Sequence, residues 1–261
     1  MGNKGRKEEV INNQKMHAQT IVNYVLDEVE KNSEKIGVLL CEGDENSIDK
    51  IVYSAVFPDL VIVPLGSCCT IMRLLSRVKK ILASYHLYAF GIIDRDALSK
   101  PEIKKMKETR GVYTTKLPFI ENIVCAPEML NHLCEDMNLN YEETLEKINE
   151  QLMKILWQKF KESLPINLGI EKKERIESLQ IGAHTKKKDI EKVVNRDNIL
   201  YAYRSKVIVS IVANELHIDG RKGYYEKIKQ MLADENQHES LVKVFANFIP
   251  LLELYDFEAI S

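Results

Sequence analysis

The sequence predicts an α/β fold in which a mostly parallel sheet is flanked by helices and followed by a helical C-terminal region. Three short apolar runs, at residues 36–41, 60–63 and 86–93, have the composition of buried parallel strands. Segments with apolar residues at helical spacing separate them, which is the pattern of crossover units in a parallel sheet. Beyond residue 127, helical patterns continue without a further buried strand.

Each element of the predicted α/β domain follows from its local pattern. Ile21, Val25 and Val29 recur at helical spacing and predict a helix before the first strand. Pro58 ends the helix that follows the first strand. The predicted elements are a helix at 16–31, a strand at 36–41, a helix at 46–57, a strand at 60–63, a turn at 64–67, a helix at 68–84, a strand at 86–93, a helix at 100–108 and a strand at 112–115.

The C-terminal half is predicted to be helical, and the charged stretch at 171–177 is expected to be an exposed helix face. We therefore expect three parts, with an N-terminal lead-in and helix at 1–32, an α/β domain at 33–130 and a helical region at 131–261. The predicted helices of the last part are 127–138, 142–163, 199–216 and 223–233.

Composition bounds the class of protein. Apolar residues make up 45% of the chain and charged residues 29%, as is ordinary for a soluble globular protein. The formal net charge is −2, so any nucleic-acid partner requires a local basic patch. The five cysteines lack CxxC spacing, which argues against zinc and indicates a reducing compartment. The polar N-terminus and the absence of a long apolar run predict a cytoplasmic protein with no membrane partner.

Acidic residues directly follow two of the predicted strands. Glu42 closes the first strand together with Gly43, and Asp94-Arg95-Asp96 closes the strand at 86–93. The carboxyl ends of parallel strands gather functional groups at one edge of a sheet. Alternate side chains of an extended segment share a side, so Asp94 and Asp96 are expected to face one ion. Such an oxygen-rich pocket suits Mg²⁺, with Mn²⁺ as a substitute.

Each motif alone has a simpler explanation. Glu42 fits a solvated residue at a strand end, and Asn46 is a candidate cap of the next helix. Asp-x-Asp occurs in haloacid-dehalogenase phosphatases, sugar-nucleotide glycosyltransferases and toprim nucleases. In the dehalogenase type the motif ends the first strand, whereas here it follows two earlier strands. The glycosyltransferase reading leaves the Glu-Gly strand unexplained.

The order of these motifs resembles the toprim fold of topoisomerases, bacterial primases and OLD-family nucleases. The segment Leu117–Leu130 contains Ile-Glu-Asn followed by Pro-Glu-x-Leu, and it is similar to an element of the DUF4435 proteins, which are OLD-like toprim proteins. The turn Pro64–Ser67 matches their second-strand segment. The resemblance covers about residues 36–130. One departure is Asn46, which stands where the family often has Asp.

This resemblance implies site roles. Glu42 would be the toprim glutamate, acting as a metal ligand or general acid/base, and Asp94 and Asp96 would be paired metal ligands. Glu121 would be an additional acidic residue near the metal, with local hydrogen bonding that orders the loop as the alternative.

The resemblance also implies an activity and partners. The family includes the nuclease subunit of the PARIS anti-phage system, so we expect a nuclease that cleaves RNA, in particular tRNA, or DNA. An ABC-type ATPase is the implied partner. It would be a separate protein, because the chain has no G-x-x-x-x-G-K-[ST] motif. The helical region is the expected surface for a homodimer.

A basic stretch offers a candidate contact with nucleic acid. Lys186, Lys187 and Lys188 are followed by Arg204, with Tyr201 and other tyrosines nearby. Basic residues and interleaved tyrosines suit a phosphate backbone and unstacked bases. The simpler alternative is a solvated loop that leads into a helix.

Two other functions compete with the nuclease. The first is a degenerate toprim module that serves as a regulatory or interaction subunit, which Asn46 favours and the intact Glu42, Asp94 and Asp96 disfavour. The second is a Mg²⁺-dependent phosphatase or transferase on a similar sheet, which would act on small phosphoesters.

Overall fold

The computed structural model describes residues 18–96, 98–161, 169–172, 175–178, 199–202 and 207–250. These residues fall into two compact units. The described part of the first contains the chain up to Ile93 together with Lys104–Thr114. The described part of the second contains the remainder of the chain from Asp94 to Pro250. The sequence-predicted boundary at residue 130 falls inside the second unit.

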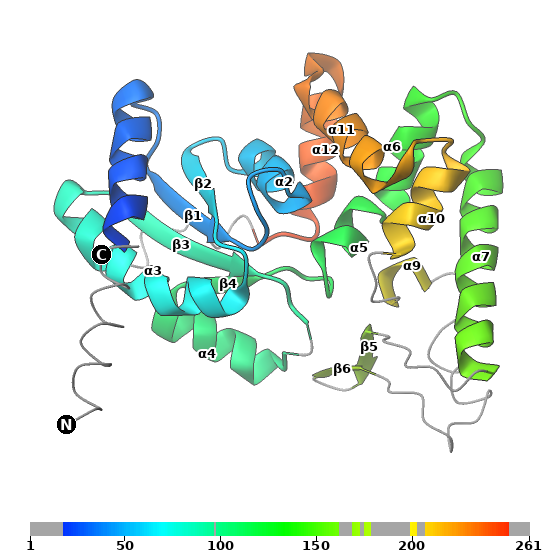
Figure 1. The fold of residues 1–261 in the computed structure, drawn as a ribbon, viewed down its shortest axis with the longest axis horizontal. Coiled ribbons are helices and arrows are strands. Elements are labelled where there is room, and N and C mark those ends of the chain that lie inside the picture. Colours follow the sequence, from blue (N-terminus) through cyan, green and yellow to red (C-terminus); the bar gives the residue numbers. More distant parts are fainter. Residues whose placement is uncertain are drawn as a thin grey trace, which may run out of the picture. The chain divides into compact units, whose positions relative to one another are not determined.

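The first unit is built on a four-stranded sheet in the order β2-β1-β3-β4, and every pair of neighbours is parallel (Figure 1). The structure thus confirms an α/β fold with a parallel sheet flanked by helices. The strands are β1 (Gly37–Cys41), β2 (Leu60–Pro64), β3 (Tyr88–Ile93) and β4 (Val112–Thr114). β1 is wholly buried, as its unbroken apolar sequence predicts.

Helices cover both sides of this sheet. Figure 1 shows α2 on one side and α3 on the other, together with the part of α4 that belongs to the first unit. Packing against α3 is tight, because a methyl group on Gly91 of β3 would lie 2.9 Å from Cγ2 of Ile71. The helices of this part of the chain are 18–31, α2 (Ile48–Val56), α3 (Cys68–Leu82), the short 3₁₀ helix η1 (Ala83–Tyr85) and α4 (Lys100–Arg110).

The start of α2 corrects one prediction. Ser47 is the N-cap, and its Oγ accepts a hydrogen bond from the backbone N–H of Lys50 at 3.4 Å. Asn46 is therefore not the cap. It lies in the preceding turn, where its own backbone N–H donates to Oδ1 of Asp44 at 2.9 Å. Ser and Asn are both favoured caps, so the sequence alone did not separate the neighbours.

The short helix η1, which follows α3 directly, ends at a left-handed residue. His86 has a φ of 57°, its N–H donates to the carbonyl of Ala83, and the N–H of Leu87 donates to the carbonyl of Leu82. This pair of bonds is the Schellman arrangement, with His86 where glycine is usual. The turn that leads into β3 is therefore fixed by backbone hydrogen bonds.

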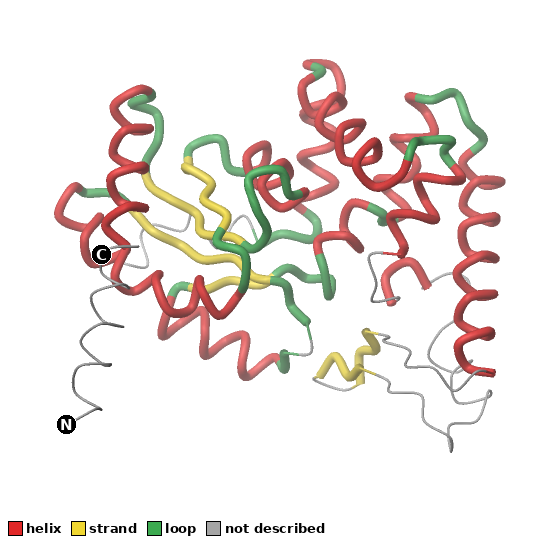
Figure 2. Tube along the Cα trace, viewed as in Figure 1, coloured by secondary structure: helices red, strands yellow, loops and turns green. Residues whose placement is uncertain are grey.

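The described part of the second unit is mostly helical, as predicted for the C-terminal region (Figure 2). The predicted helix at 199–216 is described as two helices, and residues 203–206 between them lie outside the described residues. Two helices of this unit, α5 and α12, were not predicted from the sequence. The helices are α5 (Ile120–Val124), α6 (Pro127–Asp136), α7 (Tyr141–Lys161), α9 (Ile199–Ala202), α10 (Val207–Glu215), α11 (Gly220–Ala233) and α12 (Glu235–Ala246).

The predicted helix face at 171–177 is wrong. This stretch contributes to an antiparallel hairpin, in which β5 (Gly169–Lys172) pairs with β6 (Arg175–Ser178). Each of these four-residue strands contains a single isoleucine, so no two-residue apolar period is present to indicate a strand.

Asp136, at the end of α6, joins three helices. Its Oδ1 accepts a hydrogen bond from Nε2 of Gln237 on α12 at 2.8 Å, and its Oδ2 pairs with the ammonium group of Lys227 on α11. These two partners hold the pKa of Asp136 below its usual value.

Among the described residues, no helix has the length and apolar character needed to cross a membrane.

Candidate functional site

The sheet has a topological switch point beside β1. The connection from β1 leads to β2 on one side, and the chain then crosses to β3 on the other side. In open α/β sheets, ligands bind in the crevice outside the carboxyl ends of strands at such a point. Glu42 is the residue that follows β1, and Asp94 is the residue that follows β3. Both predicted carboxylates therefore come directly after the strands that flank the switch point.

The loop that carries Glu42 is joined by two backbone hydrogen bonds to the loop after β2. The N–H of Gly66 donates to the carbonyl of Gly43 at 2.8 Å, and the N–H of Gly43 donates back at 3.4 Å. Gly43 has a φ of 81°, and a methyl group there would lie 2.3 Å from Oγ of Ser47. A residue with a side chain does not fit at position 43, so glycine is required there. This tight turn fixes the position of the backbone at the neighbouring Glu42.

Asp49 and two cysteines, Cys41 and Cys68, lie near this loop in the first unit. Burial, followed by the negative charge of Glu42, raises the pKa of the Cys68 thiol, so this thiol is a neutral neighbour. Asp49, in the first turn of α2, is only 8% exposed, and a methyl group on Gly43 would lie 3.2 Å from its Oδ2. Burial and then the charge of Asp49 raise the pKa of Cys41.

Asp49 is a candidate residue that the sequence analysis missed. In the sequence, Asp49 is only an acidic residue in the first turn of a helix. Such residues are common, because the positive end of a helix favours carboxylates. Only the fold shows that this carboxylate lies beside Gly43.

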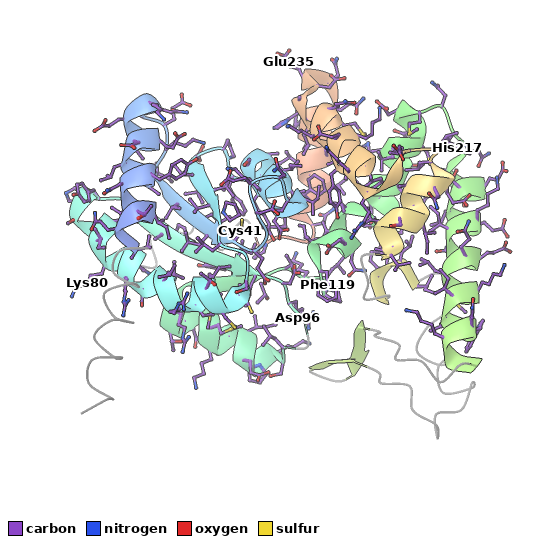
Figure 3. All side chains as sticks on the ribbon, viewed as in Figure 1. Cys41, Lys80, Asp96, Phe119, His217 and Glu235 are labelled. Atoms are coloured by element: carbon purple, nitrogen blue, oxygen red, sulfur yellow. The ribbon has the colours of Figure 1, made fainter. Side chains whose placement is uncertain are left out.

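The second unit holds Asp94 and Asp96 against the Ile-Glu-Asn element. The backbone N–H of Ile120 donates to Oδ1 of Asp94 at 3.1 Å, and the backbone N–H of Asp96 donates to the carbonyl of Pro118 at 3.1 Å. Figure 3 labels Asp96 and Phe119 in this region. The Asp94-Arg95-Asp96 motif and the Ile-Glu-Asn element are therefore in direct contact.

Arg95 is hydrogen-bonded to the segment that follows β4. Its backbone N–H donates to Oγ1 of Thr115 at 3.2 Å, and Nη1 of its side chain donates to the carbonyl of Lys116 at 3.1 Å. These two bonds help to fasten the loop between β3 and α4.

The backbone of Asp96 corrects a further expectation. Its φ is 47°, in the left-handed region, and it lies in a turn. Asp94 and Asp96 therefore do not alternate as in an extended strand, so the argument that placed them on one side does not hold. Aspartate tolerates this conformation better than most residues, which the sequence pattern did not reveal.

Glu121 belongs to α5, whose five residues are all buried. Glu121 is 9% exposed, and its neighbour Asn122 is 1% exposed. Nδ2 of Asn122 donates to the carbonyl of Leu200 on α9 at 2.9 Å, and the hydroxyl of Tyr224 on α11 donates to the carbonyl of Val124 at 2.6 Å. This short helix thus ties the Asp94 loop to α9 and α11.

Replacing Asn122 by alanine is expected to lower the free energy of unfolding by about 1–3 kcal/mol, because the buried carbonyl of Leu200 loses its donor. Chemical denaturation of the purified protein measures this loss. Asn131→Ala is the matched control, since Asn131 makes an exposed bond to Glu135 at 2.7 Å. Equal stability of the two variants would contradict the structural role of Asn122.

The predicted nucleic-acid contacts Lys186, Lys187, Lys188 and Arg204 lie outside the described residues. Tyr201, named beside them, is described. Its hydroxyl donates to Oε2 of Glu128 at 3.0 Å, and burial followed by this hydrogen bond raises its pKa.

The predicted magnesium ligands are divided between the units, with Glu42 in the first and both aspartates in the second. In the part of the chain that the structure describes, no group of three or more His, Cys, Asp or Glu residues is placed to hold a metal ion together. The donor chemistry itself fits Mg²⁺, because all three predicted ligands offer carboxylate oxygens.

Comparisons of the chain with family models, with curated proteins and with solved structures gave no match.

Proposed function

We propose that the protein is a metal-dependent nuclease that hydrolyses phosphodiester bonds in RNA, in particular tRNA, or in DNA. One observation carries the proposal: Glu42 and Asp94 follow the two parallel strands that flank the switch point of the sheet. Carboxylates at this position suit a hard cation and the phosphate of a substrate.

Each residue has a role in this proposal. Glu42 is a metal ligand or general acid/base, and the Gly43–Gly66 bridge keeps its loop in place. Asp94 and Asp96 are ligands, and the Ile120 N–H orients the Asp94 carboxylate. Glu121 is an additional acidic residue near them. Bound Mg²⁺, or Mn²⁺ in its place, supplies Lewis-acid activation of water and charge stabilisation at the leaving oxygen.

The proposed biological role is that of an anti-phage effector in the cytoplasm, controlled by a separate ABC-type ATPase. The support is the toprim-like order of motifs, to which the structure adds the contact between the Asp94 loop and the Ile-Glu-Asn element. A homodimer is part of the same proposal.

A degenerate toprim module that acts by binding is the second candidate. The observation that favours it is Asn46, which stands where the resembled family often has Asp. The two candidates differ in whether the purified protein turns over a substrate.

The test is an assay of the purified full chain with labelled RNA, labelled DNA and a small phosphoester, in Mg²⁺, Mn²⁺ or EDTA. Asp94→Asn is expected to reduce metal-dependent cleavage by about 100-fold or more, because the charge is lost. Thermal stability is expected to change little, since the amide oxygen still accepts the Ile120 N–H.

Asp234→Asn is the matched control, because Asp234 also accepts a backbone N–H, from Asn236 at 2.9 Å. It is expected to cleave like the wild type. Hydrolysis of the small phosphoester alone would favour a phosphatase. Cleavage that persists in Asp94→Asn would overturn the assigned role, and binding without turnover would favour the degenerate module.

A further inference from the structure

At the amino ends of the strands, opposite Glu42 and Asp94, the sheet has exposed aromatic and basic side chains that play no part in the proposed metal site. Exposed tyrosines lie at the turn from α3 into β3, where Tyr85 is 51% exposed and Tyr88 is 43% exposed. Lys79 and Lys80 are exposed in the last turn of α3, directly before this turn. Basic and aromatic residues are therefore concentrated at the amino ends of the strands.

The spatial grouping extends to the neighbouring strand. A methyl group on Gly111 would lie 3.5 Å from Nζ of Lys79, so this ammonium group is held over the turn between α4 and β4. Arg110, exposed at the end of α4, directly precedes that glycine. We call Lys79, Lys80, Tyr85, Tyr88 and Arg110 the amino-edge patch, and all five belong to the first unit.

The patch is held in shape before any ligand binds. The Tyr88 ring stacks on Phe90 with centroids 6.2 Å apart and planes 19° apart, and Phe90 meets Tyr113 edge-on at 6.2 Å. Tyr85 directly precedes His86, whose backbone hydrogen bonds fix the turn. The two tyrosine rings therefore lie on a backbone that is already ordered. Less conformational entropy of the protein is lost when a ligand binds to them.

The charge of this region departs from that of the chain. α3 contains arginines and lysines but no acidic residue, whereas the formal net charge of the whole chain is −2. The acidic residues Glu34 and Asp59 precede β1 and β2 and not β3 or β4, and Glu108 of α4 pairs with Lys104 at 3.7 Å. Positive charge in the last turn of α3 also stabilises that helix, but this role does not account for exposed tyrosines.

We propose that the amino-edge patch is a docking surface for single-stranded nucleic acid. Tyr85 and Tyr88 stack on unpaired bases, and Lys79, Lys80 and Arg110 contact the phosphate backbone. This combination of a basic surface and aromatic platforms is the one that sequence-tolerant single-strand binding uses. Because the patch lies at the end of the sheet opposite Glu42, it acts as a binding surface separate from the proposed catalytic residues.

The test is a fluorescence-anisotropy titration of the full chain against labelled single-stranded RNA and DNA of about 20 nucleotides, in EDTA. Tyr85→Ala is expected to weaken binding at least about fivefold, whereas Tyr85→Phe binds like the wild type. Lys79→Glu/Lys80→Glu is expected to weaken binding and to reduce the slope of log K against log salt by about 1.4, for two phosphate contacts.

The matched control is Lys154→Glu/Lys229→Glu, which makes the same change of charge at exposed positions of α7 and α11. It is expected to bind like the wild type. Because the titration is made in EDTA, failure of the nuclease proposal would not affect this result. No binding to either oligonucleotide, or equal loss in the control, would overturn the inference. Binding to phosphatidylserine vesicles in place of oligonucleotides would overturn it too.

Discussion

Replacing Glu42 by glutamine is expected to reduce metal-dependent cleavage by at least about 100-fold while the fold is retained. Glutamine has nearly the same size, so the loop that the Gly43–Gly66 bridge holds is not disturbed. The amide lacks the negative charge and the basicity that a metal ligand or general base needs. Initial rates of cleavage measure the effect, with circular dichroism as the check on folding.

Glu45→Gln is the control for this experiment. Glu45 lies in the same loop, is exposed and pairs with Lys50, so its loss removes the same charge three residues away. We expect cleavage within about twofold of the wild type, because surface pairs contribute little. If both variants lose activity equally, the effect is one of local charge and Glu42 has no special role.

Replacing Gly37 by alanine is expected to destabilise the protein by about 3 kcal/mol or more. A methyl group on Gly37 would lie 2.3 Å from the carbonyl oxygen of Tyr88 and 2.9 Å from its backbone nitrogen. These are backbone atoms of β3, so no side-chain rotation relieves the overlap, and β1 and β3 must separate. Denaturant unfolding measures the loss of stability.

Gly66→Ala separates the overlap from the cost of losing a glycine. Gly66 has a φ of 80°, but nothing lies within 4 Å of an added methyl group. Its replacement is expected to cost only about 1–2 kcal/mol, the penalty of the left-handed conformation. A loss at Gly37 no larger than that at Gly66 would show that β1 and β3 yield easily.

The parallel sheet was predictable because its strands are buried on both sides. The apolar runs at 36–41 and 60–63 match β1 and β2 closely, since no alternation is needed in such strands. The hairpin β5–β6 was not predictable from charge density, and α5 is too short for a helical period to be visible. Local pattern therefore located the strands of the parallel sheet and most helices, and missed the hairpin, α5 and the twelve-residue helix α12.

The candidate site was predictable in part for a related reason. Strand ends can be read from sequence, so Glu42 and Asp94 were found as residues that follow β1 and β3. The left-handed Asp96 and the contact of Asp94 with Ile120 depend on pairing between distant segments. Asp49 was missed because its position resembles ordinary helix capping, and only its proximity to Gly43 distinguishes it.

The two outer strands of the sheet bear on how copies of this protein can associate. β4 has only three residues, and β2 ends in Pro64, which has no N–H to donate. Short outer strands and prolines are means by which proteins avoid edge-to-edge pairing and aggregation. Association by extending the sheet from one copy to the next is therefore disfavoured at both edges, and the homodimer proposed above would form through side-chain surfaces.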